Sequence, residues 1–260
     1  MKEIRYGIPD KPDLGDTLLL TPVFKNNPGT MEFNRTARGA QISELFRGLC
    51  DIRFVDKVLP ESEYFTRYGN ITKKQPLNHA CKNYCSIFGV ETNDFIPKII
   101  LTEDEKQFAR EFTKDLRNPI TITPITGIFP NDPQKTATWM LSQEKWNELT
   151  AELSKKHDIL YFSKSGTDFK INNTIELFGM DVRKMCALFN ICGRNIGIEN
   201  GLLHAAIASG ATTYNLIQGY SWGYNIYAPN YIYTPDMWQN EPKRAFYFLL
   251  NDYKKILEHF

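Results

Sequence analysis

Apolar and polar positions follow two different spacings along the first part of the chain. Short apolar runs bounded by turn residues predict strands, and apolar residues three or four positions apart predict helices. Residues 16–27 have this helical spacing, and Asp16 is the expected N-cap of the helix. The predicted strands are residues 3–8, 30–35 and 51–55, and a second helix is predicted at 39–49. Strands and helices that alternate in this way indicate a parallel α/β sheet.

A second alternation begins after a proline-marked stretch. Thr102 and Glu105 have the spacing of a capping box for a helix that ends near residue 116, and Asn118-Pro119 closes it. The later strands are predicted at 120–125, 158–162, 194–198 and 211–217, and the later helices at 142–156, 181–192, 200–209 and 243–258. The predicted fold class is therefore α/β, with two Rossmann-like parallel-sheet domains facing across a cleft. We predict domains at residues 1–117 and 118–260, with the last helix free to return to the first domain.

Composition narrows the class of protein. The chain has 260 residues with a net charge of +1, and 13% of them are aromatic. Such a composition is typical of a globular protein and not of a polybasic one. No apolar run approaches the roughly 20 residues of a membrane span. Pro9 and Asp10 interrupt the start before any signal core forms. We therefore expect a cytoplasmic protein without a transmembrane segment.

The five cysteines lack metal-site spacing. Cys81 and Cys85 lie four residues apart, but only His79 is near them, and a zinc site needs four ligands. We therefore expect buried structural thiols and no metal site.

One locally basic stretch lies between Tyr64 and Val90. Its cations are Arg67, Lys73, Lys74 and Lys82, interleaved with Tyr64, Phe65, Tyr68 and Tyr84. Such a stretch is able to contact phosphates or bases, which keeps a nucleic-acid partner open. A solvated basic surface explains the same residues.

Residues 194–217 carry the strongest candidate site. An apolar strand runs into Glu199-Asn200-Gly201, and a helix follows with Leu202 and His204 in its first turn. Asn200 could cap that helix or donate to a phosphate oxygen. Free N–H groups and the positive end of a helix dipole attract anions, so this turn predicts a phosphate site. An ordinary strand–helix turn with a packed histidine fits the same spacing.

Two further features also follow predicted strands. Lys135 lies in a Gly/Pro/Asn loop after strand 120–125, where it could hold a phosphate or simply be solvated. Gly15-Asp16 follows the first strand, where the carboxylate could act as a general base or only cap the helix.

These features together resemble glycosyltransferase family 9, the heptosyltransferase-like enzymes with the GT-B fold. The family's Gly-Asp, apolar helix and Pro pattern resembles Gly15 to Pro22, and its Lys-x-Trp-Pro loop resembles Lys135 to Trp139. Its Asp-Thr/Ser-Gly-x-x-His-x-Ala-Ala signature resembles Glu199 to Ala206. Glu199 and Asn200 depart from that signature, the lysine loop is stretched, and the first domain is short.

The resemblance implies an inverting, metal-independent transferase that needs no cofactor and takes a sugar from a nucleotide-diphosphate donor such as ADP-heptose. Asp16 would then be the general base, and Gly15 would lie beside the donor. Donor binding would involve Lys135, Met180, Glu199, Asn200, Gly201, Leu202 and His204. The acceptor, a glycan or another hydroxyl compound, is left open.

Two alternatives keep this fold and change the function. One is a nucleotide-sugar epimerase or hydrolase, which would act without an acceptor. The other is a non-catalytic protein that binds a nucleotide sugar or a glycan, which the altered Glu199-Asn200 pair would suit. A nucleic-acid base as acceptor is a variant of the transferase hypothesis.

Overall fold

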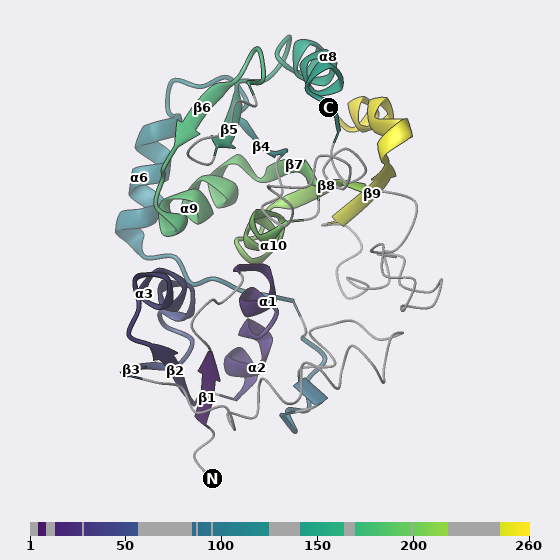
Figure 1. The fold of residues 1–260 in the computed structure, drawn as a ribbon. Helices are drawn as coiled ribbons and strands as arrows, with labels where there is room; N and C mark the ends of the chain where they lie inside the picture. Colours follow the sequence, from purple (N-terminus) through teal and green to yellow (C-terminus); the bar gives the residue numbers. More distant parts are fainter. Residues whose placement is uncertain are drawn as a thin grey trace. The chain divides into compact units, whose positions relative to one another are not determined.

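The computed structural model divides the chain into two compact units (Figure 1). It describes residues 5–8, 14–27, 29–56, 85–86, 88–94, 96–124, 141–163, 170–198, 200–217 and 245–260. Among these, the first unit holds residues up to Ile100 and the second holds those from Leu101 onward. The division falls before helix α6 (Glu103–Thr113), whereas the sequence prediction put it at 117/118, because α6 packs on α9 (Val182–Cys192) of the second unit.

The first unit contains a three-stranded parallel sheet, as predicted. Its strands β1 (Arg5–Ile8), β2 (Thr30–Asn34) and β3 (Asp51–Val55) lie in that order. The helical elements between them are α1 (Leu14–Leu18), α2 (Thr21–Asn26), α3 (Ala37–Ser43) and the 3-10 turn η1 (Glu44–Phe46). Their core is apolar and includes Phe24, Phe33 and Phe46, which are fully buried.

The predicted N-cap role of Asp16 is wrong. Helix α1 begins at Leu14, so Asp16 lies inside it. The long predicted helix is also broken after Leu18, and α2 starts again at Thr21 with Pro22 in its first turn. Proline lacks the N–H that would continue the α1 hydrogen-bond ladder, which is why the helix restarts there.

The second unit is a six-stranded parallel sheet with the strand order β6-β5-β4-β7-β8-β9. The strands are β4 (Ile120–Thr123), β5 (Ile159–Ser163), β6 (Ile175–Phe178), β7 (Arg194–Ile198), β8 (Thr212–Ile217) and β9 (Ala245–Leu249). The predicted helices over 142–156 and 200–209 are confirmed as α8 (Gln143–Leu153) and α10 (Gly201–Ala208). This all-parallel sheet confirms the α/β class.

Different helices cover the two faces of this sheet. On one face, apolar strand residues such as Ile122 and Ile196 join Trp146 and Leu149 of α8 in a buried apolar cluster. The other face meets α9, where the Phe162 ring contacts the Phe189 ring with centroids 5.0 Å apart. Because side chains alternate along a strand, neighbours in sequence belong to opposite faces.

The end of the chain differs from its prediction. Residues 245–249 form strand β9 beside β8, and a 3-10 helix, η3 (Leu250–His259), follows it. The aromatic-rich run Ala-Phe-Tyr-Phe-Leu favours a strand over the predicted helix. Helix η3 packs in the second unit, where Ile256 is fully buried and the Tyr253 hydroxyl donates to Glu148 at 2.6 Å. It belongs to the second unit.

Candidate functional site

The strand order of the second sheet defines one place where ligands bind in such folds. From the central pair β4 and β7, the chain runs outward through β5 and β6 on one side and through β8 and β9 on the other. In open parallel sheets this reversal opens a crevice at the carboxyl ends of the two central strands. Here those ends are Thr123, at the end of β4, and Ile198, at the end of β7, which the turn into α10 follows.

Asn200 builds that turn. Its backbone is extended, with φ −162° and ψ 174°. Its Oδ1 accepts a hydrogen bond from Leu203 N at 2.8 Å. This is the bond that an N-cap residue makes, so the predicted cap is confirmed. The Asn200 Nδ2 donates to the Thr123 carbonyl oxygen at 3.1 Å. One buried side chain therefore fixes the start of α10 and links it to the neighbouring strand.

The first turn of α10 presents backbone N–H groups at this edge. Gly201 and Leu202 are only partly buried. The first residues of a helix have no carbonyl one turn earlier to receive their N–H groups. The positive end of the helix dipole lies at the same place. This geometry can bind an anion such as a phosphate group.

His204 lies one turn into α10 and is buried, with 7% of its surface exposed. The predicted position in the first turn is confirmed. Its neighbours Leu203, Ala205 and Ala206 are buried as well. His204 therefore has the packed environment that was the alternative prediction for it.

A polar seam runs through the sheet beneath this turn, and sequence reasoning missed it. The Thr121 hydroxyl donates to Asn195 Oδ1 at 3.0 Å, and Asn195 Nδ2 donates to Thr123 Oγ1 at 3.3 Å. All three side chains are at most 1% exposed. The visible signal was threonine at alternate positions of strand 120–123, together with an asparagine in strand 194–198.

Gly197 makes room for this seam. A Cβ atom placed on Gly197 would lie 2.1 Å from Thr123 Oγ1, which is far inside contact distance. Gly197 pairs with Thr123 across the two central strands, so only glycine allows the Thr123 hydroxyl to lie there. A glycine inside a strand was the signal that could have marked this close approach.

Met180 lies at the same edge of the sheet, beyond the end of β6. It is partly buried, and Asp181 follows it as the N-cap of α9, accepting hydrogen bonds from Arg183 N at 2.9 Å and Lys184 N at 3.3 Å. The strands of this sheet are parallel, so their carboxyl ends all lie at the same end of the sheet. Met180 and the start of α10 both lie at that end.

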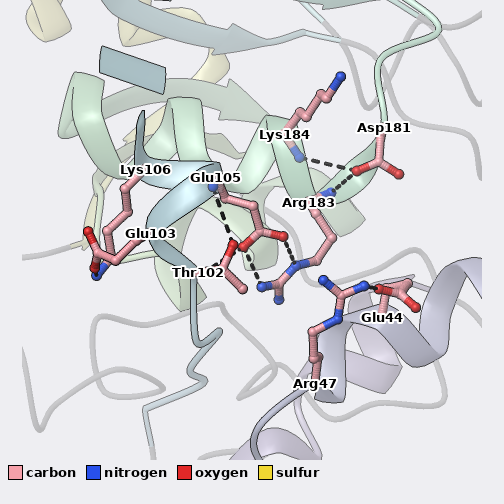
Figure 2. Close-up of polar contacts among 9 residues, drawn as sticks. All are labelled: Glu44, Arg47, Thr102, Glu103, Glu105, Lys106, Asp181, Arg183 and Lys184. Atoms are coloured by element: carbon pink, nitrogen blue, oxygen red, sulfur yellow. Dashed lines mark hydrogen bonds and ion pairs between the residues drawn. The ribbon is translucent and has the colours of Figure 1, made fainter. Parts of the chain in front are cut away.

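An ion pair fastens this end of α9 to α6 (Figure 2). Arg183 Nε donates to Glu105 Oε1 at 2.8 Å and Arg183 Nη2 to Glu105 Oε2 at 2.6 Å. Glu105 also completes the predicted capping box, because it accepts from Thr102 N at 2.8 Å. Burial raises the pKa of Glu105, but the hydrogen bonds from Arg183 and Thr102 outweigh it and bring the pKa below its usual 4.5.

Two of the remaining predicted site residues lie in the first unit. Gly15 and Asp16 are in α1 of that unit. Gly15 is buried, and the side chain of Asp16 is not among those that the structure describes. Lys135 and Glu199 lie outside the described residues, as do Tyr64 to Tyr84 of the basic stretch. Of the predicted donor residues, the structure brings together Asn200, Gly201, Leu202 and His204.

The described cysteines do not suit nucleophilic chemistry. Burial raises the pKa of Cys186 to about 12 and that of Cys85 to about 11. Both therefore remain protonated thiols near neutral pH. Both side chains are buried, which confirms the prediction for them.

Within the described ranges, no group of three His, Cys, Asp or Glu side chains has the arrangement of a metal site. No described helix has the length and apolar content that crossing a membrane requires.

No protein-family model matches the sequence, and no curated protein sequence matches it either. Solved structures do match. The crystal structure of the glycosyl transferase family 9 protein from Veillonella parvula superposes with a TM-score of 0.63 at 13% identity, over 98% of this chain and 88% of that one. The fold is that of the family 9 glycosyltransferases.

Two Escherichia coli structures share this family 9 fold with the chain. ADP-heptose lps heptosyltransferase II has a TM-score of 0.58 at 10% identity, covering 99% of each chain. Heptosyltransferase WaaC, solved with ADP, has a TM-score of 0.58 at 10% identity, covering 98% of this chain and 99% of WaaC. These likenesses confirm, for the fold, the resemblance that the sequence motifs carried.

Proposed function

We propose that this protein is an inverting, metal-independent glycosyltransferase that moves a sugar from a nucleotide-diphosphate donor to an acceptor hydroxyl. The observation that carries the proposal is the capped start of α10 at the strand-order reversal of a family 9 fold. An ADP-heptose-like donor is the first candidate, since the similar structures include an ADP-heptose heptosyltransferase and WaaC with ADP.

In the proposed mechanism the donor diphosphate lies against the N–H groups of Gly201 and Leu202. Negative charge grows on the diphosphate as its bond to the sugar breaks, and preorganised N–H groups stabilise that charge without having to reorganise. Lys135 adds a positive charge to the same leaving group. Met180 lies at the same sheet edge, where the nucleobase would extend past β6.

The acceptor side belongs to the first unit. Asp16 removes the proton from the acceptor hydroxyl, and the resulting oxygen attacks the anomeric carbon from the face opposite the diphosphate. The bond from the acceptor oxygen to the anomeric carbon forms as the bond from that carbon to the diphosphate oxygen breaks. The configuration at the anomeric carbon therefore inverts. This chemistry requires the two units to face each other across a cleft, with Asp16 opposite α10.

Release of nucleotide diphosphate tests the proposal. Purified protein is incubated with ADP-, UDP- and GDP-sugars and a panel of glycan acceptors, with EDTA present, and the nucleotides are separated by chromatography. We expect acceptor-dependent release of one nucleotide diphosphate and a product of inverted anomeric configuration by NMR. Release of free sugar without an acceptor would identify a hydrolase, and binding without release a non-catalytic protein.

Asp16→Ala tests the general base. We expect kcat to fall about 10²–10⁴-fold, the usual contribution of a positioned base, with the donor KM nearly unchanged. The matched control is Asp56→Ala, which removes a carboxylate of the same unit whose side chain is 96% exposed, and should leave kcat unchanged. Equal activity of Asp16→Ala and wild type would remove Asp16 from the mechanism.

A further inference from the structure

The start of α10 depends on one side chain that bonds in two directions. We propose that Asn200 is a positioning residue, which ties α10 to the end of β4 and thereby holds the Gly201 and Leu202 N–H groups ready for a diphosphate. This inference rests on the proposed function, because it assigns the diphosphate of the donor to that turn.

The two bonds of Asn200 do different work. The bond from Leu203 N to Oδ1 at 2.8 Å caps the helix. Any Ser, Thr, Asp or Asn could make such a cap. The bond from Nδ2 to the Thr123 carbonyl at 3.1 Å leaves the helix and crosses to another strand. Serine can make the first bond, but it has no amide group to make the second while its oxygen caps the helix.

The anchor on β4 is itself held in place. Thr123 is 1% exposed, its hydroxyl accepts from Asn195 Nδ2 at 3.3 Å, and Asn195 in turn accepts from Thr121. A continuous set of buried hydrogen bonds therefore runs from the middle of the sheet to the first turn of α10. Such networks restrict the groups that they join more than isolated bonds do.

The helix needs this support because it is short. Helix α10 has eight residues. Short helices gain little stability from their own backbone bonds. A first turn fixed before the ligand arrives loses less conformational entropy on binding, which raises affinity. The bond from Asn200 to Thr123 is therefore expected to raise the affinity for the donor, by fixing the turn, as well as the stability of the fold.

Asn200→Ser separates the tie from the cap. The matched control is Asn190→Ser, because Asn190 Nδ2 makes the same kind of bond, to the Ser209 carbonyl at 2.7 Å, just beyond the other end of α10. The dissociation constant of ADP is measured by titration calorimetry and the melting temperature by scanning calorimetry. We expect both variants to melt earlier, and ADP binding to weaken about tenfold in Asn200→Ser alone.

A second measurement uses the wild-type protein. We expect the backbone amides of Leu203 to Ala206, in the capped helix, to exchange with deuterium as slowly without ADP as those of β7, while the Gly201 and Leu202 amides gain protection when ADP is added. Amides of Leu203 to Ala206 that exchange freely without ADP and become at least tenfold slower with it would overturn the proposal.

The outcomes separate the two proposals. If wild type binds ADP and Asn200→Ser binds it equally well, Asn200 is only a helix cap and the proposed function still stands. If wild type binds none of ADP, UDP and GDP, both proposals are wrong.

Discussion

At the residue scale, the contact between Gly197 and Thr123 sets how closely β7 and β4 approach at the candidate site. Thr123 supplies a hydroxyl to the polar seam and a backbone carbonyl to Asn200, and its hydroxyl lies in the space that a Cβ on Gly197 would fill. The space is already filled, since a Cβ added at Gly197 would meet Thr123 Oγ1, which is itself hydrogen-bonded.

Gly197→Ala is therefore expected to lower the unfolding free energy by about 1–3 kcal/mol, as overpacking of a filled core does. Urea unfolding followed by circular dichroism measures it. The double variant Gly197→Ala/Thr123→Ala removes the clashing hydroxyl but also the acceptor of the buried Asn195 Nδ2, so it should recover only part of the loss. A single variant as stable as wild type would show that the strands separate at no cost.

At the element scale, the Arg183–Glu105 pair decides where α6 belongs. The pair is bidentate and nearly buried, with side-chain exposures of 4% for Arg183 and 13% for Glu105 (Figure 2). Because Glu105 also caps α6, one carboxylate joins the first turn of α6 to the first turn of α9. This contact explains why α6 is part of the second unit.

Arg183→Met should lower the unfolding free energy by about 3–5 kcal/mol, because it leaves the Glu105 carboxylate buried without its partner. Adding Glu105→Gln removes the stranded charge, retains a capping residue, and should recover part of the loss. Denaturant unfolding of both variants measures the difference. An exposed ion pair contributes less than about 1 kcal/mol. A loss of that size in Arg183→Met would contradict the conclusion that this pair holds α6 on α9.

The same pair predicts a pH dependence. The pKa of Glu105 is lower in the folded protein than its usual 4.5. The stability that Glu105 contributes is therefore fully present above that pH and is lost as the pH falls through the lowered pKa. Denaturant unfolding over a series of acidic pH values measures this loss. The drop in unfolding free energy on acidification should be shallower in Glu105→Gln.

Glu103→Gln is the control for that measurement. The pKa of Glu103 is also lowered, by its hydrogen bond to Lys106. Its side chain, however, is 77% exposed. Salt screens such surface pairs. In high salt the acid dependence of Glu103→Gln should match that of wild type. Equal curves for Glu105→Gln and wild type would contradict the prediction.

At the scale of the whole molecule, each unit has a parallel sheet of its own, and the candidate donor turn lies in the second. A ligand that binds only the folded state stabilises it by about 2.7 kcal/mol at 100 times its dissociation constant. We therefore expect one class among ADP-, UDP- and GDP-sugars to raise the melting temperature of the intact protein. Hydrogen exchange should locate the protection in peptides from residues 101–217, and protection confined to residues 5–56 would contradict the assignment.

Much of the local structure was predictable because it depends on neighbouring residues. The capping box of Thr102 and Glu105 and the cap at Asn200 were both visible as short sequence patterns. Strand β6 was missed because its residues Ile175, Glu176 and Phe178 are exposed at the sheet edge, so burial imposes no pattern on them. The segment that forms β9 was predicted as a helix although its aromatic-rich run favours a strand, and its pairing with β8 is not a local property.

The sequence by itself determined the α/β class, the positions of most strands and helices, and the turn at Asn200-Gly201, since periodicity and capping act over a few residues. Only the tertiary structure decided the strand order, the packing of η3 in the second unit, and the bond from Asn200 to Thr123. These depend on contacts between residues far apart in the chain. The candidate site needs both kinds of contact. The cap at Asn200 is local, but Asn200 also bonds to β4, and it can do so only because the sheet places β4 beside β7.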